Sequence, residues 1–121
     1  MERDGSLRAL ALARLNLGVQ LADLRRAEDA QRHLEGALAL SREIGWRNCE
    51  MMAVRELGAA YRRVGELDRS RRSIEQAVAM AEMAGDPLDA ALSRVRLGEL
   101  CTTCGLLEEA RTHLKAAHDA I

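Results

Sequence analysis

The chain has 121 residues, 18 basic and 19 acidic side chains, a formal net charge of -1, and a hydrophobic fraction of 48%. Only 2% of its residues are aromatic, with one proline and no phenylalanine, so a core must be built from Leu, Ala, Val and Met, which favours helix packed on helix. The near-neutral charge gives no general attraction to nucleic acid or to an anionic membrane, and no apolar run approaches the ~20 residues that span a bilayer.

Glycines recur at an interval of 40 residues and divide the chain into three copies of one helical hairpin. The series that share this interval are Gly5, Gly45 and Gly85; Gly18, Gly58 and Gly98; and Gly65 and Gly105. A fixed interval of this size without a strand signal is typical of stacked repeat arrays. The sequence therefore predicts a single domain over 1–121, with repeats at about 7–46, 47–86 and 87–121.

The first repeat opens the chain. Residues 1–6 are expected to resemble the end of a preceding repeat, because Gly5 shares the register of Gly45. A helix over about 7–24 follows, whose leucines recur at the spacing of an apolar helix face: Leu10, Leu17, Leu21 and Leu24. Arg25 and Arg26 occupy the turn where the later repeats have glycine, so this turn is predicted to be the least regular of the three.

A second helix is predicted over about 27–44, ending at Gly45, where the left-handed backbone costs glycine least. Its inward residues are expected to be Ala30, Leu34, Ala37, Leu38 and Ser41. Trp46 is expected to pack over the junction to the next repeat. Repeat two then pairs about 47–64 with 67–84, and repeat three pairs about 87–104 with 107–120. Asp86 followed by Pro87 is a helix start signal.

One glycine series lies inside the predicted first helices, at Gly18, Gly58 and Gly98. Glycine in a helix interior costs about 1 kcal/mol relative to alanine. Its recurrence at one register therefore predicts that another backbone passes close by. The expected small counterparts on the second helices are Ala37, Ala77 and Ala117.

The repeated pattern resembles the tetratricopeptide repeat. In the second copy it reads Leu57, Gly58, Tyr61, Gly65, Ser70, Ile74 and Ala77. The period is 40 residues rather than the usual 34, and the proline that commonly closes the repeat is missing. This long form is similar to repeats in bacterial LuxR-like and antibiotic-pathway transcriptional regulators. The resemblance implies an all-α, right-handed superhelical solenoid of three helix-turn-helix repeats, with six antiparallel helices.

The resemblance also implies a binding surface, because the first helices of the family line a concave groove where partner segments dock. The candidate partner-binding residues, carried over position by position, are Asn16, Val19, Met52, Arg55, Ala59, Arg62, Arg96, Glu99 and Thr102. The same face takes in Leu12, Leu15, Ala22, Glu56, Arg63, Leu92 and Val95. Arg55, Ala59 and Arg62 share one helix face, and an alanine flanked by arginines suits a carboxylate or a ligand backbone. The alternative is that these arginines only solvate an exposed face.

Chemical sites are not indicated. Cys101 and Cys104 form a C-x-x-C pair, but Cys49 is expected about 20 Å away, at the far end of a neighbouring helix. Cys101 shares the register of Tyr61 and Leu21, which favours a small core side chain over a metal or redox group. His33 and His113 are predicted two repeats apart. The sequence therefore predicts no catalytic residue, no metal and no cofactor.

The resulting prediction is a non-catalytic module that binds a protein or peptide segment, with an acidic segment as one candidate because of the arginines. Three cysteines without secretory features indicate a cytoplasmic setting, and the expected context is the sensing or partner-binding part of a bacterial regulator. The alternative is a structural module that forms a homo-oligomer through its end helices. Ile121 shares the register of Ser41 and Ala81, which suggests a chain cut from a longer protein.

Overall fold

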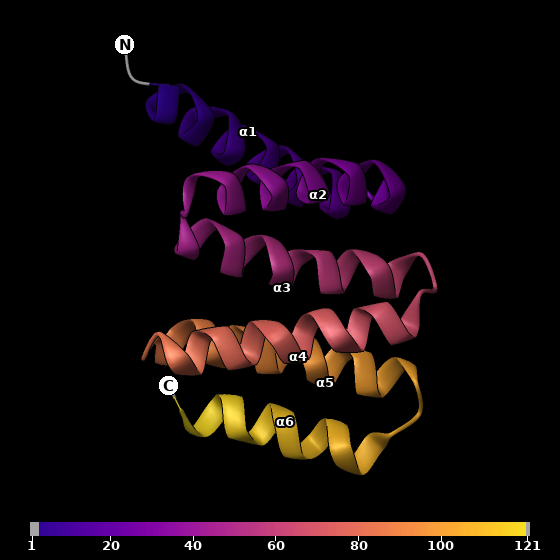
Figure 1. Ribbon diagram of the computed structural model, residues 1–121. Coiled ribbons are helices and arrows are strands. Elements are labelled where there is room, and N and C mark those ends of the chain that lie inside the picture. The colour runs from indigo at the N-terminus through magenta and orange to yellow at the C-terminus, as the bar shows by residue number, and fades with distance from the viewer. Residues whose placement is uncertain (1–2, 121) are drawn as a thin grey trace.

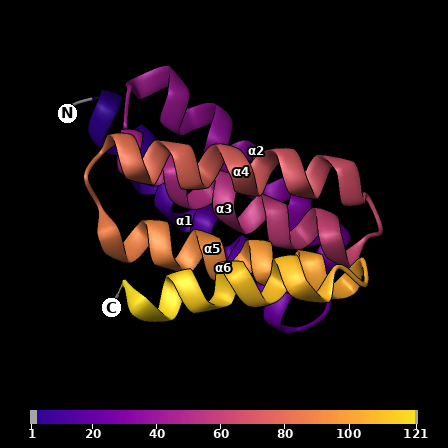
Figure 2. The same cartoon turned by 90° about the horizontal axis from the view of Figure 1, so that it is seen from below.

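The computed structural model describes residues 3–120, which form an all-α protein (Figure 1). Its helices are α1 (Arg3–Asp23), α2 (Ala27–Ile44), α3 (Arg47–Arg63), α4 (Leu67–Met83), α5 (Pro87–Thr103) and α6 (Leu107–Asp119). Figures 1 and 2 show them lying side by side and reversing direction at each turn. Within the described residues, none of the helices combines the length and apolar character that crossing a bilayer requires. Ile121, and with it the register comparison to Ser41 and Ala81, lies outside the described residues.

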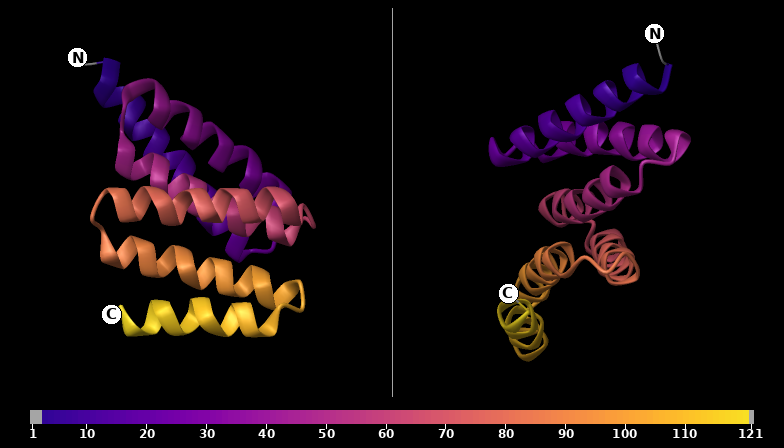
Figure 3. Two further views of the ribbon diagram at one scale, coloured as in Figure 1. Left: turned by 60° about the horizontal axis from the view of Figure 1, so that its bottom comes forward. Right: turned by 90° about the vertical axis from the view of Figure 1, so that its left-hand side faces the viewer.

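The helices stack as three successive hairpins. α1 packs on α2, α3 on α4 and α5 on α6, and the hairpins are joined by α2 against α3 and α4 against α5 (Figure 3). The first helices also approach one another, since α1 contacts α3 and α3 contacts α5. Over residues 3–120, no Cα atoms of α2 and α4, or of α4 and α6, come within 8 Å. The first helices therefore lie closer together than the second helices do.

The predicted helix bounds are confirmed to within one residue for α2 through α6. The prediction for residues 3–6 is wrong, because α1 already begins at Arg3 and runs through Gly5. Gly45 and Gly85, in the same register, take the left-handed conformation after the ends of α2 and α4. No described helix precedes Gly5, and it keeps a helical backbone.

Each hairpin turn contains one residue in the left-handed region. Gly65 and Gly105 have φ of 87° and 76°, and Arg25 occupies the same position in repeat one with φ of 62°. Arg25 N–H donates to the Ala22 carbonyl at 3.0 Å, and Gly65 N–H donates to Arg62 in the same way at 3.1 Å. The expectation of an irregular first turn is therefore wrong. Arg25 adopts the left-handed conformation that this turn requires, and because a side chain disfavours that conformation, the backbone is strained at Arg25.

Replacing Arg25 with glycine is expected to stabilise the protein by about 0.5–1 kcal/mol, because relief of the left-handed strain exceeds the added entropy of the unfolded chain. The measurement is equilibrium urea unfolding followed by circular dichroism. Arg26→Gly is the matched control, since Arg26 has φ of -105° and gains no relief. Equal or lower stability of Arg25→Gly than of Arg26→Gly would contradict the strain argument.

The junctions between hairpins follow the predicted signals. Asp86 accepts a hydrogen bond from the Asp89 N–H at 2.9 Å, and Pro87 stands at the first position of α5. Trp46 packs against the core of the first two repeats, and the Arg8 guanidinium lies 4.8 Å from the centre of its ring. The expected role of Trp46 at the junction is confirmed.

The buried face of α1 agrees with the predicted one only at Leu21. Ala11, Leu15 and Leu21 are buried, whereas Leu10, Leu17 and Leu24 are exposed. α1 carries two apolar faces, and the leucine spacing alone does not identify the one that meets α2 and α3. In contrast, the inward residues predicted for α2 lie in the core or against it.

The glycines inside the first helices accommodate the second helix of the same hairpin. A Cβ atom on Gly18 would lie 2.7 Å from the Leu34 side chain and 3.3 Å from the Ala30 carbonyl oxygen. Ile74 fills the corresponding space at Gly58, and Leu114 does so at Gly98. The predicted close approach is confirmed. Its partners are these branched side chains, not Ala37, Ala77 and Ala117, which are buried at other positions.

Gly58→Ala is expected to destabilise the protein by about 1–2 kcal/mol, because overpacking against the fully buried Ile74 outweighs the gain in helix propensity. Gly98→Ala is the matched comparison. Its neighbour Leu114 is exposed and can rotate away, so its free energy of unfolding is expected within about 0.5 kcal/mol of wild type. Thermal and urea unfolding of the two variants measure the difference, and equal losses would refute this account of the glycines.

Candidate partner-binding surface

The first helices present a row of exposed apolar side chains at one register. Leu12 on α1, Met52 on α3 and Leu92 on α5 are each exposed, although the residue before each of them is buried: Ala11, Met51 and Ala91. We call Leu12, Met52 and Leu92 the apolar row. Because α1, α3 and α5 neighbour one another, the apolar row crosses all three hairpins on a single face.

Charged residues beside the apolar row pair with one another between repeats. Arg55 on α3 binds Asp89 on α5 and also Glu56, with 3.2 Å between Nε and Oε2. Arg96 on α5 reaches back to Glu56 at 3.1 Å and binds Glu99 at 3.2 Å. The Arg55–Asp89 and Arg96–Glu56 pairs link α3 to α5, and together with the two pairs inside these helices they neutralise most of the charge in the middle of the face.

This pairing changes the expected role of the arginine face. The Arg55 side chain is 11% exposed, and Ala59 is buried at 4% exposure. A ligand carboxylate would have to displace Asp89 to reach Arg55, and Ala59 offers almost no accessible surface. The proposed cradle of Arg55, Ala59 and Arg62 is therefore not available as an open carboxylate site.

The remaining predicted residues lie on the same face in different environments. Asn16 and Thr102 are exposed, Val19 is half-buried, and Arg62 donates weakly to the Thr103 hydroxyl at 3.4 Å. Arg63 donates to the Ala22 carbonyl and, like Arg62, has no ion pair within the described part of the chain. Arg63 borders a pocket of about 530 Å³, whose other lining residues are Ala22, Asp23, Arg25 and Ala27. Two positive charges without an ion pair among the described residues thus lie at the C-terminal end of α3.

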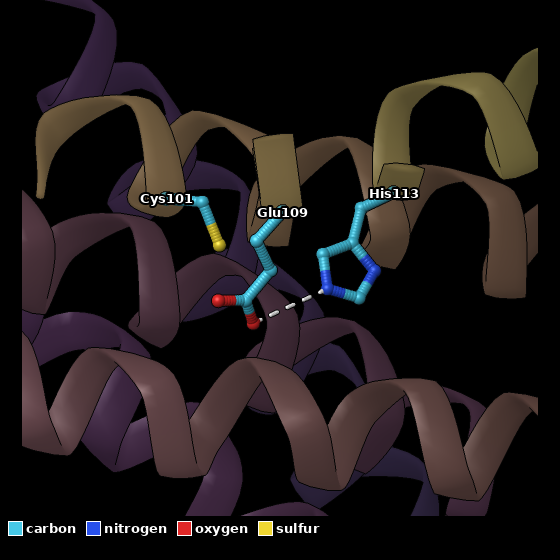
Figure 4. Close-up of side chains that lie close together, drawn as sticks. All are labelled: Cys101, Glu109 and His113. Carbon is cyan, nitrogen blue, oxygen red and sulfur yellow. Dashed lines mark ion pairs between the residues drawn. The ribbon is translucent and has the colours of Figure 1, made fainter. Parts of the chain in front are cut away.

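A second cluster joins α5 and α6. Cys101, Glu109 and His113 have ligand atoms within 4.8 Å of one another, and Figure 4 shows the three side chains converging. His113 Nε2 lies 3.7 Å from a Glu109 oxygen. Thiolate, carboxylate and imidazole are all zinc ligands, so these are the residues that could hold a metal.

Arg71 from α4 already supplies a cation to this cluster. Its guanidinium binds Glu109 and lies 3.9 Å from the Cys101 sulfur. The hydrogen bond from Arg71 lowers the pKa of Glu109, whereas burial raises the pKa of the Cys101 thiol and favours its neutral form. The arrangement is explained by an ion pair between the second helices of repeats two and three, beside a core cysteine.

From the sequence, Cys101 was compared only with Cys104 and Cys49, and His113 only with His33, so the approach of Glu109 and His113 to Cys101 was not predicted. The signal that could have found them is their i, i+4 spacing at the start of α6. The Gly105 turn brings this first part of α6 back against the end of α5, where Cys101 lies.

Comparison with known proteins finds no matching family model and no matching curated protein.

One thiol per chain is expected to react rapidly with Ellman's reagent in the native state. Cys104 is exposed, whereas Cys49 and Cys101 are buried, and burial raises the pKa of both buried thiols and lowers their thiolate fraction. All three should react in denaturant, and Cys104→Ser should remove the rapid phase. Two or more rapid thiols in the folded protein would contradict the buried placement of Cys49 and Cys101.

Proposed function

We propose that the chain is a non-catalytic tetratricopeptide-type module that binds a protein or peptide segment on the face of α1, α3 and α5. The observation that carries the proposal is the apolar row, since Leu12, Met52 and Leu92 stay exposed at one register in all three repeats. Isolated exposed apolar residues are ordinary, but an aligned set on neighbouring helices is typical of an interaction surface.

The packing supports a curved stack with this face on the inside. The first helices contact one another, whereas the described second helices stay farther apart, so the stack bends toward α1, α3 and α5. The right-handed sense of the superhelix is what the resemblance to the tetratricopeptide repeat implies, and we propose it on that ground.

The chemistry of the face favours a segment with apolar side chains. Arg55, Glu56 and Arg96 are already engaged in ion pairs within the chain. Specificity for the partner segment would therefore come from the apolar row and from neutral polar side chains such as Asn16 and Thr102. Arg62 and Arg63 stand at the C-terminal end of α3 without ion pairs among the described residues. We therefore propose that the partner segment is apolar along most of its length and acidic at one end.

The setting follows from the resemblance alone. Long repeats of this kind are similar to those of bacterial transcriptional regulators, and we propose a cytoplasmic regulatory protein in which this module recognises the partner. We propose that the module itself carries out no chemistry.

The test begins with selection of binding peptides from a displayed random library, followed by fluorescence anisotropy with the selected peptide. Met52→Glu or Leu92→Glu should weaken binding at least about tenfold, because burying an apolar side chain of this size contributes about 1.5–3 kcal/mol. Met83→Glu is the matched control, since Met83 is also exposed but lies at the end of α4.

Amide shifts in NMR spectra should map the same peptide onto α1, α3 and α5. Arg62→Glu should weaken an acidic peptide by a smaller, salt-dependent factor. Peptides that bind Met52→Glu and Leu92→Glu as well as wild type would refute the proposal, as would a library that yields no binder.

A further inference from the structure

The outer face of α1 is unlike the same face of α3 and α5. Leu17 is 42% exposed, whereas the residues in its register, Leu57 and Leu97, are 2% and 4% exposed. Ala13 is exposed although Ala53 is fully buried. In repeats two and three, this face is covered by the second helix of the preceding repeat. α1 contacts α2 and α3 and no other described helix.

The outer face of α6 shows the complementary difference. Leu114 is 40% exposed, whereas Leu34 and Ile74 in the same register are fully buried. Ile74 reaches its buried state in a cluster with Leu97, Leu100 and Cys101 of the next repeat. Ile74 shares the register of Leu114, and Leu97 shares the register of Leu17. A side chain at the position of Leu114 therefore packs against one at the position of Leu17 when two repeats adjoin.

We propose that these two surfaces bind each other between copies of the chain, so that α6 of one copy packs on α1 of the next, head to tail. The α1 outer face consists of Ala13, Leu17, Gln20 and Leu24, and the α6 outer face consists of Leu107, Arg111, Leu114 and Lys115. The contact repeats the packing of α2 on α3 and of α4 on α5, which the chain already forms twice.

Charge complementarity supports a second copy as the occupant. Inside the chain, Glu35 pairs with Arg69 at 3.6 Å, and Arg71 pairs with Glu109. At a junction between two copies, the position of Glu35 is taken by Lys115 of one copy, and the position of Arg71 is taken by Arg111 of that copy. Asp29 on α2 of the next copy takes the position of both Arg69 and Glu109. Both junction pairs again join opposite charges.

The junction should be weaker than the internal interfaces. Gln20, a polar residue, shares the register of Ala60 and Leu100, which are buried at the internal interfaces. Asp29 already binds Arg26 and Arg32 of its own copy. The association is therefore reversible, and because the two surfaces differ, it is heterologous and grows beyond a dimer at high concentration.

Two half-blocked variants give the decisive experiment. Leu17→Glu removes the α1 outer face and Leu114→Glu removes the α6 outer face, and the two side chains are 42% and 40% exposed. By sedimentation velocity, wild type should gain mass with concentration, whereas each variant alone should remain a monomer. An equimolar mixture should form one 1:1 dimer, with twice the monomer mass and no larger species, because only one pair of intact surfaces remains.

Circular dichroism first confirms that each variant is folded, and Met83→Glu serves as the control that assembles like wild type. Met52→Glu should also assemble normally, which separates this proposal from the peptide-binding face. A wild type that stays monomeric at every concentration would overturn the proposal, as would a mixture that forms no dimer. Self-association of Leu114→Glu alone would also overturn it, in favour of a symmetric α1–α1 contact.

Discussion

The structure depends on one repeated packing arrangement, in which a branched side chain of the second helix fills the space left by a glycine of the first. Leu34 at Gly18, Ile74 at Gly58 and Leu114 at Gly98 occupy equivalent places. The missing Cβ lets the two helices of a hairpin approach closely. In repeats one and two the same side chain also packs against the following repeat, so one contact sets both the hairpin and the stack.

Comparing registers separates two kinds of exposed apolar surface. The apolar row is exposed in all three described repeats, so its exposure is a property of the repeat itself, in keeping with the binding face we propose. Leu17 and Leu114 are exposed in the first and last described hairpins, whereas the residues that share their registers are buried in the other hairpins, so their exposure depends on position in the array. A surface patch considered without its register would not show this distinction.

The sequence predicted the features that depend on local geometry. Helix bounds followed from the glycine series, the Asp86–Pro87 start and apolar periodicity, because each acts within a few residues. Features that depend on distant partners were not predictable. Arg55 seemed free until the fold placed Asp89, 34 residues along the chain, beside it. Likewise Leu10, Leu17 and Leu24 form an apolar stripe whose exposure follows from what packs on α1. The Arg25 turn was misjudged because the hairpin imposes its conformation on a residue that disfavours it.

The succession of contacts in the stack bears on how the chain folds. Each helix packs on the helix before and after it, and the contacts between first helices span a single repeat. Nearly all native contacts therefore join segments that are close in sequence, and ordering them closes only short loops. Proteins with such low contact order fold quickly, and in a repeat array folding can start in any hairpin and spread to its neighbours.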